Sequence, residues 1–432
     1  MGSQLTKTNL IERDLKCIWH PFTQSKTAPP PIAISRAEGT YLFSDDGRRY
    51  IDAISSWWVN LHGHSHPYIV QKITDQLQRM EQVIFSDFTH EGAVTLAEQL
   101  LRLLKLKNGR VFYSDNGSTA VETALKMSIQ YWHQSQQPRI KIICFENGYH
   151  GDTFGAMSTA GIASFNRPFR PYLFEVETIP PPYVGNEENS INKMKGLLAK
   201  NDVACFIFEP LLQGAAGMIS HSLDGLNTLI NLCQKHDAIT IADEVMTGFG
   251  RTGSLFVWDR LNAKPDVICL SKGITGGFIP FGATVCNDRI FNQFYSDDPT
   301  HSFLHGHSYC GNPLACAAAL ASIELLEDPS CSRQRTMIEK SHHEFKSKLG
   351  NHPRIERCEV IGTIFVLEYR LQDNPSTYFS SFKHKLKRYF LDRNIYIRPL
   401  GNILYLLPPY CISIADLQEI YACIETSLEE VL

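Results

Sequence analysis

The sequence predicts an α/β fold with a mostly parallel central sheet. Four apolar runs rich in β-branched residues predict buried strands, at residues 140–146, 203–210, 238–245 and 265–271. A segment with helical spacing, residues 223–235, separates two of them. A strand followed by a helix and another strand is typical of parallel strands joined by crossover helices. Continuous apolar runs fit this arrangement, because parallel strands are buried on both faces of the sheet.

Other segments predict helices and, later in the chain, shorter elements. Helical spacing covers residues 117–132, and an alanine-rich helix is expected at 310–326. Beyond these, the pattern predicts a helix that ends at Leu349, one strand near 360–369, another helix, two strands at 394–399 and 402–409, and a terminal helix.

This change of pattern predicts two domains. We expect a large cofactor-binding domain at residues 66–330 and a smaller C-terminal α+β domain at 331–432. The N-terminal segment, residues 1–65, is expected to pack with the small domain. The fold class is therefore α/β, with a second, smaller α+β unit.

Composition narrows the class of protein. The chain has 432 residues, of which 43% are hydrophobic and 20% are charged, and its formal net charge is −4. This balance favours neither nucleic acid nor an anionic membrane as a partner. No run reaches the roughly 18 apolar residues of a membrane span, and the N-terminus lacks the apolar core of a signal peptide. Twelve cysteines without a C-x-x-C pair indicate reduced thiols, so we expect a cytoplasmic protein.

Charged side chains stand where predicted strands end. Glu209, Asp243 and Lys272 each follow an apolar run. In an open parallel sheet, ligands bind beyond the carboxyl ends of the strands. An acid and a lysine there form either a structural ion pair or a cofactor site in which the lysine forms a Schiff base. Desolvation favours the uncharged, nucleophilic amine. The pattern by itself leaves both interpretations open.

Neighbouring segments favour pyridoxal phosphate, which needs a lysine, an anion at its ring nitrogen and a phosphate cradle. Asp243 supplies the anion. Gly117 and Ser118 open a predicted helix whose free amide groups suit a phosphate, although an ordinary helix cap has the same pattern. Tyr149 and His150 follow another strand and offer flat rings to stack on the cofactor.

Six segments identify a family. In chain order they are YSDNGSTAVETALKM, NGYHGDTFGA, FIFEPLLQGAAGM, ITIADEVMTGFGRTG, CLSKGITGG and HGHSYCGNPLACAAA. With them, the chain resembles the fold-type I, class III pyridoxal-phosphate aminotransferases over nearly its whole length. The resemblance implies that Lys272 binds the cofactor and acts as the catalytic base, that Asp243 faces the ring nitrogen and that Tyr149 stacks on the ring.

Three aromatic-rich segments narrow the resemblance: IWHPFTQ, DAISSWWVNLHGH and IRPLGNILYLLPPY. Within the class, the chain is most similar to the aminotransferases of biotin synthesis, which form 7,8-diaminononanoate from 8-amino-7-oxononanoate by ping-pong chemistry. The similarity implies that Arg398 pairs with the acceptor's carboxylate and that Trp58 forms an apolar wall for its chain. It also implies a homodimer.

The resemblance assigns further residues to the site. Gly117, Ser118, His307 and the partner subunit's Ser308 are expected at the cofactor phosphate. Substrates are expected to contact a larger set, which consists of Phe22, Trp58, Tyr149, Arg251, Lys272, Gly306 and Arg398.

The amino donor is predicted to be S-adenosylmethionine, with lysine as the alternative. Family members that use S-adenosylmethionine often read WHPYT and HGPTF, whereas this chain has Phe22 in WHPFT and His307-Ser308 in HGHSY. Relatives that use lysine can also read PFTQ and HGHSY. Phe22 still offers a flat face to an adenine ring, and these motifs contain no extra acid for the far charge of lysine.

Other functions compete with this prediction. A different class III ω-aminotransferase or aminomutase would share the central motifs. A non-catalytic binding protein on this fold is disfavoured, because Lys272 and Asp243 are both present. GFGRTG at 248–253 matches a dinucleotide-binding pattern but lacks a strand directly before it. The histidines at 61–66 and 301–307 lack further ligands at tight spacing, so we expect no metal.

Overall fold

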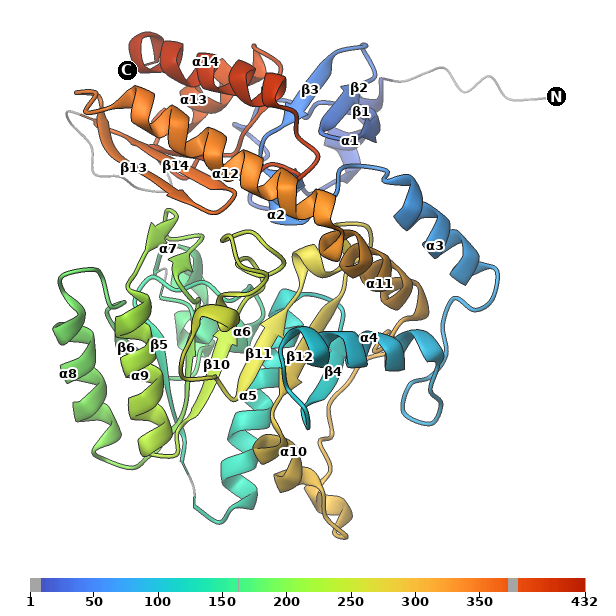
Figure 1. Ribbon diagram of the computed structural model, residues 1–432, viewed down its shortest axis with the longest axis vertical. Coiled ribbons are helices and arrows are strands. Elements are labelled where there is room, and N and C mark those ends of the chain that lie inside the picture. Colours follow the sequence, from blue (N-terminus) through green and yellow to red (C-terminus); the bar gives the residue numbers. More distant parts are fainter. Residues whose placement is uncertain (1–8, 138, 162, 372–379, 432) are drawn as a thin grey trace.

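A seven-stranded sheet forms the centre of the molecule, in the order β4-β12-β11-β10-β7-β5-β6. The structure is a computed structural model that describes residues 9–137, 139–161, 163–371 and 380–431. All neighbouring strands from β11 to β6 pair in parallel, and only β12 runs against both of its neighbours. The predicted α/β fold with a mostly parallel sheet is therefore confirmed (Figure 1). The strands are β4 (Arg110–Ser114), β5 (Lys141–Phe145), β6 (Glu177–Ile179), β7 (Val203–Phe208), β10 (Ile239–Asp243), β11 (Val267–Leu270) and β12 (Gly282–Cys286).

Helices cover both faces of this sheet, which explains why its strands are apolar throughout. Phe206 and Phe208 of β7 pack in one cluster with residues of α4 (Glu91–Leu103), α8 (Glu187–Leu198) and α9 (Leu223–Lys235). Cys205 and Ile207, which alternate with them, pack in a second cluster with α5 (Gly117–Gln134). Successive side chains of a strand point to opposite faces, so each face has its own apolar core.

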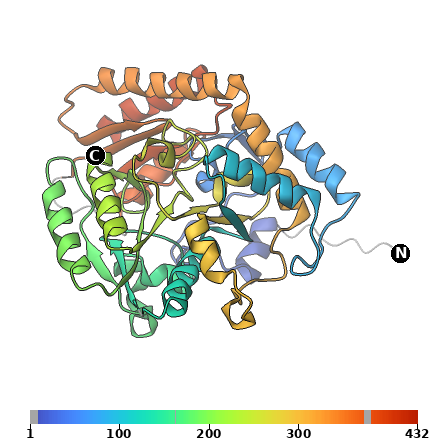
Figure 2. The ribbon, with the colours of Figure 1, turned by 60° about the horizontal axis from the view of Figure 1, so that its bottom comes forward.

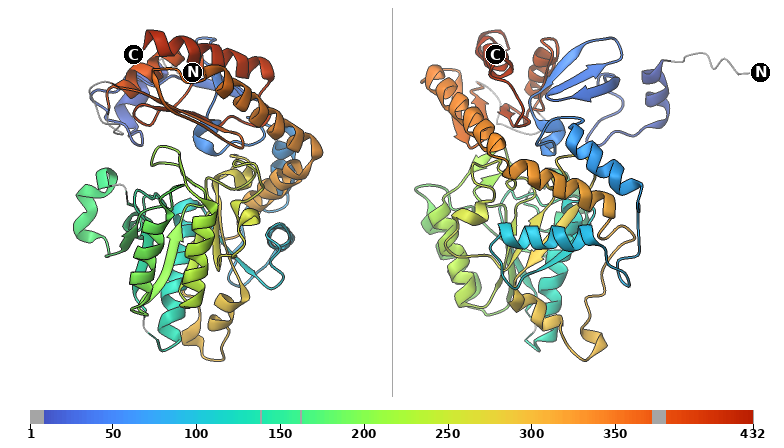
Figure 3. Two further views of the ribbon diagram at one scale, coloured as in Figure 1. Left: turned by 60° about the vertical axis from the view of Figure 1, so that its left-hand side comes forward. Right: turned by 45° about the vertical axis from the view of Figure 1, so that its right-hand side comes forward.

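The N-terminal strands and the C-terminal elements lie together at one end of the molecule (Figures 1 and 3). β3 pairs in parallel with β15 in a four-stranded sheet, and β14 lies between β13 and β16 in a three-stranded one. This pairing supports the proposed packing of the N-terminal segment with the small domain. The strands are β1 (Ile34–Glu38), β2 (Tyr41–Ser44), β3 (Arg49–Asp52), β13 (Ile355–Ile361), β14 (Ile364–Tyr369), β15 (Ile395–Tyr396) and β16 (Ile403–Leu406).

The strand predicted near residues 360–369 is present as β14, but the prediction missed the turn before it and the separate strand β13. Residues 360–369 do not form a single strand, because β13 and β14 form a hairpin that turns at Gly362 and Thr363. Gly362 has φ +56°, which a glycine adopts without strain. Consecutive apolar residues lie on both sides of this turn, so the pattern did not reveal it.

The predicted C-terminal helices are present, and Figure 2 shows α12 along the outer side of this end. In the described part of the chain, no helix combines the length and apolar character that a membrane span requires. These helices are α11 (Pro313–Glu327), α12 (Pro329–Leu349), α13 (Phe382–Leu391) and α14 (Ile414–Glu430). The other elements are α1 (Leu10–Cys17), α2 (Ser55–Trp58), α3 (Pro67–Leu77), α6 (Phe154–Ser158), α7 (Ala163–Asn166), α10 (Asp288–Phe294), β8 (Leu212–Gln213), β9 (Ile219–Ser220) and four 3₁₀ turns, Arg167–Tyr172, Val257–Arg260, Lys272–Thr275 and Pro299–His301.

Candidate active site

A cavity of about 640 Å³ lies at the carboxyl ends of the parallel strands. Its wall combines residues that follow β4, β5, β7, β10 and β11 with residues of the N- and C-terminal segments. This is the edge at which an open parallel sheet binds its ligands. The cavity brings together most of the predicted site residues, namely Phe22, Trp58, Gly117, Ser118, Tyr149, Asp243, Lys272 and Arg398.

Lys272 projects into the cavity from the turn after β11. Its backbone has φ +46°, an uncommon value for a residue other than glycine. Its Nζ lies 5.1 Å from the ring centre of Trp58. Burial lowers the pKa of the ammonium, against the opposing effect of the charges of Asp243 and Glu209. The structure thus favours a neutral, nucleophilic amine at this position.

Asp243 ends β10 beside His150. Its Oδ2 is 2.6 Å from His150 Nδ1, and its Oδ1 accepts a hydrogen bond of 3.0 Å from the amide of Val245. Both side chains are buried. The other ring nitrogen of His150, Nε2, is buried without a partner among the described residues. The two oxygens of Asp243 are therefore fixed in orientation within the cavity wall.

Glu209, which follows β7, fixes the backbone of two loops. Its carboxylate accepts hydrogen bonds from the amides of Tyr149, at 3.1 Å, and Gly214, at 3.0 Å. Burial raises the pKa of Glu209 to about 7, with His150 lowering it and Asp243 adding to the rise. The phenol of Tyr149 donates to Asp152 at 3.0 Å, so this ring is held at both ends.

The N-terminus of α5 forms a cradle of backbone amides. Asn116 caps the helix and accepts a hydrogen bond of 3.0 Å from the amide of Thr119. No described residue accepts a hydrogen bond from the amides of Gly117 and Ser118. The loop at Gly151 lies so close that a Cβ there would collide with the hydroxyl of Ser118, and its φ of +126° also requires glycine. Free amides at a helix N-terminus bind anions.

Aromatic side chains form the opposite wall. The guanidinium of Arg398 lies 4.1 Å above the ring of Trp57, and Phe22 meets the edge of the same ring at 5.4 Å. The indole of Trp58 donates to the hydroxyl of Tyr405 at 3.1 Å. Sequence reasoning assigned no role to Trp57 or Tyr405, because aromatic residues are equally typical of a core.

Four predicted residues lie outside the cavity wall of this chain. Arg251 is buried and donates to the carbonyls of Asn60 and Pro408, so it clamps backbone segments near the site. The other three belong to the 305–309 segment, where the ring of His307 lies 3.9 Å from Asp115. The roles predicted for this segment stay predictions. The residues concerned are Arg251, Gly306, His307 and Ser308.

Comparisons with known proteins identify the family. Residues 22–428 match the family model of the class III aminotransferases. The chain belongs to this family. An adenosylmethionine-8-amino-7-oxononanoate aminotransferase from Synechococcus elongatus is 46% identical over 96% of this chain and 99% of its own length. One from Helicobacter pylori is 36% identical, with 98% of each chain covered.

Solved structures of class III enzymes have the same fold. The crystal structure of the adenosylmethionine-8-amino-7-oxononanoate aminotransferase from Methanocaldococcus jannaschii has a TM-score of 0.90 at 35% identity, over 96% of this chain and 98% of the other. A PLP-bound amine transaminase from an uncultivated Pseudomonas species has a TM-score of 0.89 at 28% identity, over 96% and 99%. The expected fold type I, the aminotransferase class and pyridoxal phosphate as cofactor are thereby confirmed.

The residues of the cavity fit this cofactor. Three requirements are met by atoms that the described structure leaves available: the desolvated amine of Lys272, the rigid carboxylate of Asp243 and the free amides of Gly117 and Ser118. Gly117 also allows the approach of Val245, since a Cβ there would lie 2.8 Å from its Cγ1. The cavity is thus built for a flat, phosphorylated ring.

Proposed function

We propose that this chain transfers an amino group to 8-amino-7-oxononanoate, forming 7,8-diaminononanoate for biotin synthesis, with S-adenosylmethionine as the donor. The observation that carries the proposal is that one apolar cavity holds both Lys272 and, over Trp57, the guanidinium of Arg398. The similarity to enzymes with that name, over nearly the full length of both chains, supports it.

Each cofactor-binding group has a distinct task in this proposal. When bound, pyridoxal phosphate supplies an electron-withdrawing ring that carries the amino group between the two half-reactions. Lys272 would hold it and, once its amine is free, would take and return the proton of the substrate carbon. Asp243 would keep the ring nitrogen protonated. The amides of Gly117 and Ser118 would bind the phosphate.

The other residues would orient the substrates. Arg398 would pair with the acceptor's carboxylate in a charge-assisted, bidentate contact. Burial lowers the pKa of Lys383 and of Lys387, and the nearby charge of Arg398 lowers both further. Cationic groups therefore gather around Arg398. Trp58 would line the path of the acceptor's chain, and Phe22 would offer its ring to the adenine of the donor.

Amino transfer itself tests the proposal. The purified holoenzyme should convert 8-amino-7-oxononanoate into a product whose mass matches 7,8-diaminononanoate, when a donor is present. Activity with simple ω-amino acids and none with this acceptor would instead favour another class III aminotransferase. A protein that never acquires the visible absorbance of lysine-bound cofactor would favour a non-catalytic relative.

The first half-reaction identifies the donor. Mixed with S-adenosylmethionine alone, the enzyme should lose the visible band of the lysine-bound cofactor as the amino group is transferred. The aromatic rings around Phe22 in the cavity wall suit the adenine of S-adenosylmethionine rather than the charged end of lysine. Lysine alone should therefore leave the band unchanged. Conversion by lysine and not by S-adenosylmethionine would reverse the choice of donor but leave the acceptor assignment standing.

We also propose that the enzyme is a cytoplasmic homodimer whose segment 305–309 completes the site of the other subunit. Leu304, just before this segment, and Tyr309, at its end, have exposed fractions of 83% and 62%, and Trp19 is 89% exposed. Large apolar side chains left open in this way are typical of an interface. Light scattering after size exclusion should give twice the chain mass. A monomer with full activity at nanomolar concentration would contradict this expectation.

A further inference from the structure

The turn that carries both cavity tryptophans is strained. Each of the four residues of α2 has a positive φ: 52° at Ser55, 54° at Ser56, 105° at Trp57 and 73° at Trp58. Residues other than glycine rarely adopt this region, and a run of four is a left-handed turn. Such a conformation persists only where surrounding contacts over-determine it, and it is concentrated at functional sites.

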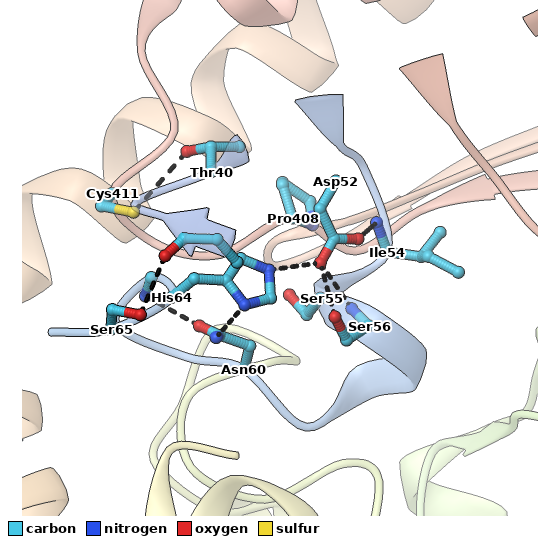
Figure 4. A network of polar contacts seen from close by, with 12 residues as sticks. Thr40, Asp52, Ile54, Ser55, Ser56, Asn60, His64, Ser65, Pro408 and Cys411 are labelled. Carbon is cyan, nitrogen blue, oxygen red and sulfur yellow. Dashed lines mark hydrogen bonds and ion pairs between the residues drawn. The ribbon is translucent and has the colours of Figure 1, made fainter. Parts of the chain in front are cut away.

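A buried carboxylate supplies those contacts (Figure 4). Asp52 is fully buried at the end of β3, directly before the turn. Its Oδ1 accepts from the amide of Ile54 at 3.2 Å. Its Oδ2 accepts from the amide of Ser56 at 2.7 Å, from the hydroxyl of Ser56 at 3.0 Å and from His64 Nε2 at 3.0 Å. Four donors thus converge on one carboxylate, and three of them belong to the turn or its entrance.

The orientation and tautomer of the His64 ring are set by Asn60. Asn60 accepts a hydrogen bond from the amide of Gly63 at 2.8 Å through Oδ1, so its Nδ2 faces His64 Nδ1 at 3.3 Å. Because that amide nitrogen can only donate, the neutral ring carries its proton on Nε2 and donates it to Asp52. Backbone hydrogen bonds in both directions between His64 and Gly39, of 2.7 and 3.0 Å, anchor the loop.

The turn positions two side chains that line the cavity. Trp58 lies 5.1 Å from Lys272 Nζ and donates to Tyr405, while Trp57 lies under Arg398 at 4.1 Å. Both tryptophans line the cavity, whereas neither Asp52 nor His64 does. The contacts of Asp52 with Ile54 and Ser56 therefore connect this pair to the cavity through the turn.

We propose that Asp52 and His64 are positioning residues, which hold the strained turn α2 so that its two tryptophans keep their places in the cavity wall. The effect on the long-chain acceptor rests on the proposed function; the effect on the turn does not. Asp52 also lies opposite Tyr396 in the pairing of β3 with β15, so a purely structural role is the alternative that the experiment must separate.

Substitutions at His64 separate these roles. In His64→Leu the hydrogen bond to Asp52 is lost, whereas the amide of His64→Gln can still donate it. Ser65→Ala is the matched control, since Ser65 belongs to the same loop but donates to the carbonyl of Ala37 instead. Asp52→Asn, which keeps the shape but removes one acceptor oxygen, should behave like His64→Leu.

For the holoenzymes we expect a roughly 10- to 100-fold lower kcat/KM for the amino acceptor in His64→Leu, the scale on which a misplaced positioning group acts. His64→Gln and Ser65→Ala should stay near the wild type. Tryptophan fluorescence and near-UV circular dichroism should change in His64→Leu alone of these three, with the thermal midpoint close to that of Ser65→Ala.

Two results would overturn the proposal. One is a His64→Leu enzyme whose kinetics and tryptophan signals match those of Ser65→Ala. The other is an equal loss in both half-reactions together with a lower thermal midpoint, which would indicate a structural role. Wild-type turnover of 8-amino-7-oxononanoate tests the proposed function separately, because the ratio between the Leu and Gln variants can be measured with whichever acceptor the enzyme uses.

Discussion

Replacement of Lys272 by alanine should abolish turnover and leave a folded protein. Among the described residues that line the cavity, Lys272 is the only lysine, and in the proposed mechanism its amine both binds the cofactor covalently and moves the substrate proton. Loss of a positioned acid–base group alone costs roughly 10²- to 10⁴-fold in rate, and the loss of covalent catalysis adds to it. Steady-state kinetics and the visible spectrum of the reconstituted protein measure both effects.

Removal of the Lys272 side chain should not unfold the protein. The amine is desolvated in the native state and its pKa is lowered by burial, so the charged form gains little from folding. Lys193→Ala is a suitable control, because Lys193 forms a half-exposed ion pair with Glu146 and does not line the cavity. A Lys272→Ala enzyme that turned over at the rate of this control would refute the assigned role.

The sequence was informative about β5, β7, β10 and β11, because these strands are largely apolar and buried on both faces. It did not predict β4, β6 or β12, and the ends of β4 and β6 carry Arg110 and Glu177. A short, continuous apolar run bounded by polar residues is typical of a buried strand. The helix at Leu223–Lys235 was predicted with the bounds that the structure has. The hairpin of β13 and β14 was not predicted, since its turn at Gly362 consists of two residues inside one apolar run. Local periodicity determines which element forms, but a tight turn depends on one backbone conformation.

The site could be predicted where its chemistry follows a strand directly. Asp243 and Lys272 end adjacent parallel strands, and strand order then brings them to one cavity. The pairing of Asp52 with His64 could not be predicted, because it depends on the left-handed turn between them. The expected contacts of the 305–309 segment lie in a second subunit, so the order of strands within one chain does not predict them.

Arg398 should determine recognition of the acceptor. In Arg398→Ala we expect the acceptor's KM to rise by an amount equivalent to roughly 2–5 kcal/mol, the range found for truncation of a buried, hydrogen-bonded charge pair. The half-reaction with the donor should suffer less, because the proposed mechanism assigns Arg398 to the acceptor's carboxylate. Arg398 lies over Trp57, and no ion pair joins it to any described residue. Its guanidinium contacts the side chain of Tyr396 but has no carboxylate partner among the described residues.

The variants of Arg398 also distinguish charge from shape. Arg398→Lys keeps the charge but loses the planar fork and much of the stacking on Trp57, so it should fall between the wild type and Arg398→Ala. Arg393→Ala provides the control, since Arg393 pairs with Glu430 on the surface of the same region. If donor and acceptor half-reactions weakened equally in Arg398→Ala, the residue would act by holding Trp57 in place. If only the acceptor's KM rose, and in proportion to the loss of the fork, the guanidinium would be the group that selects a substrate with a distant carboxylate.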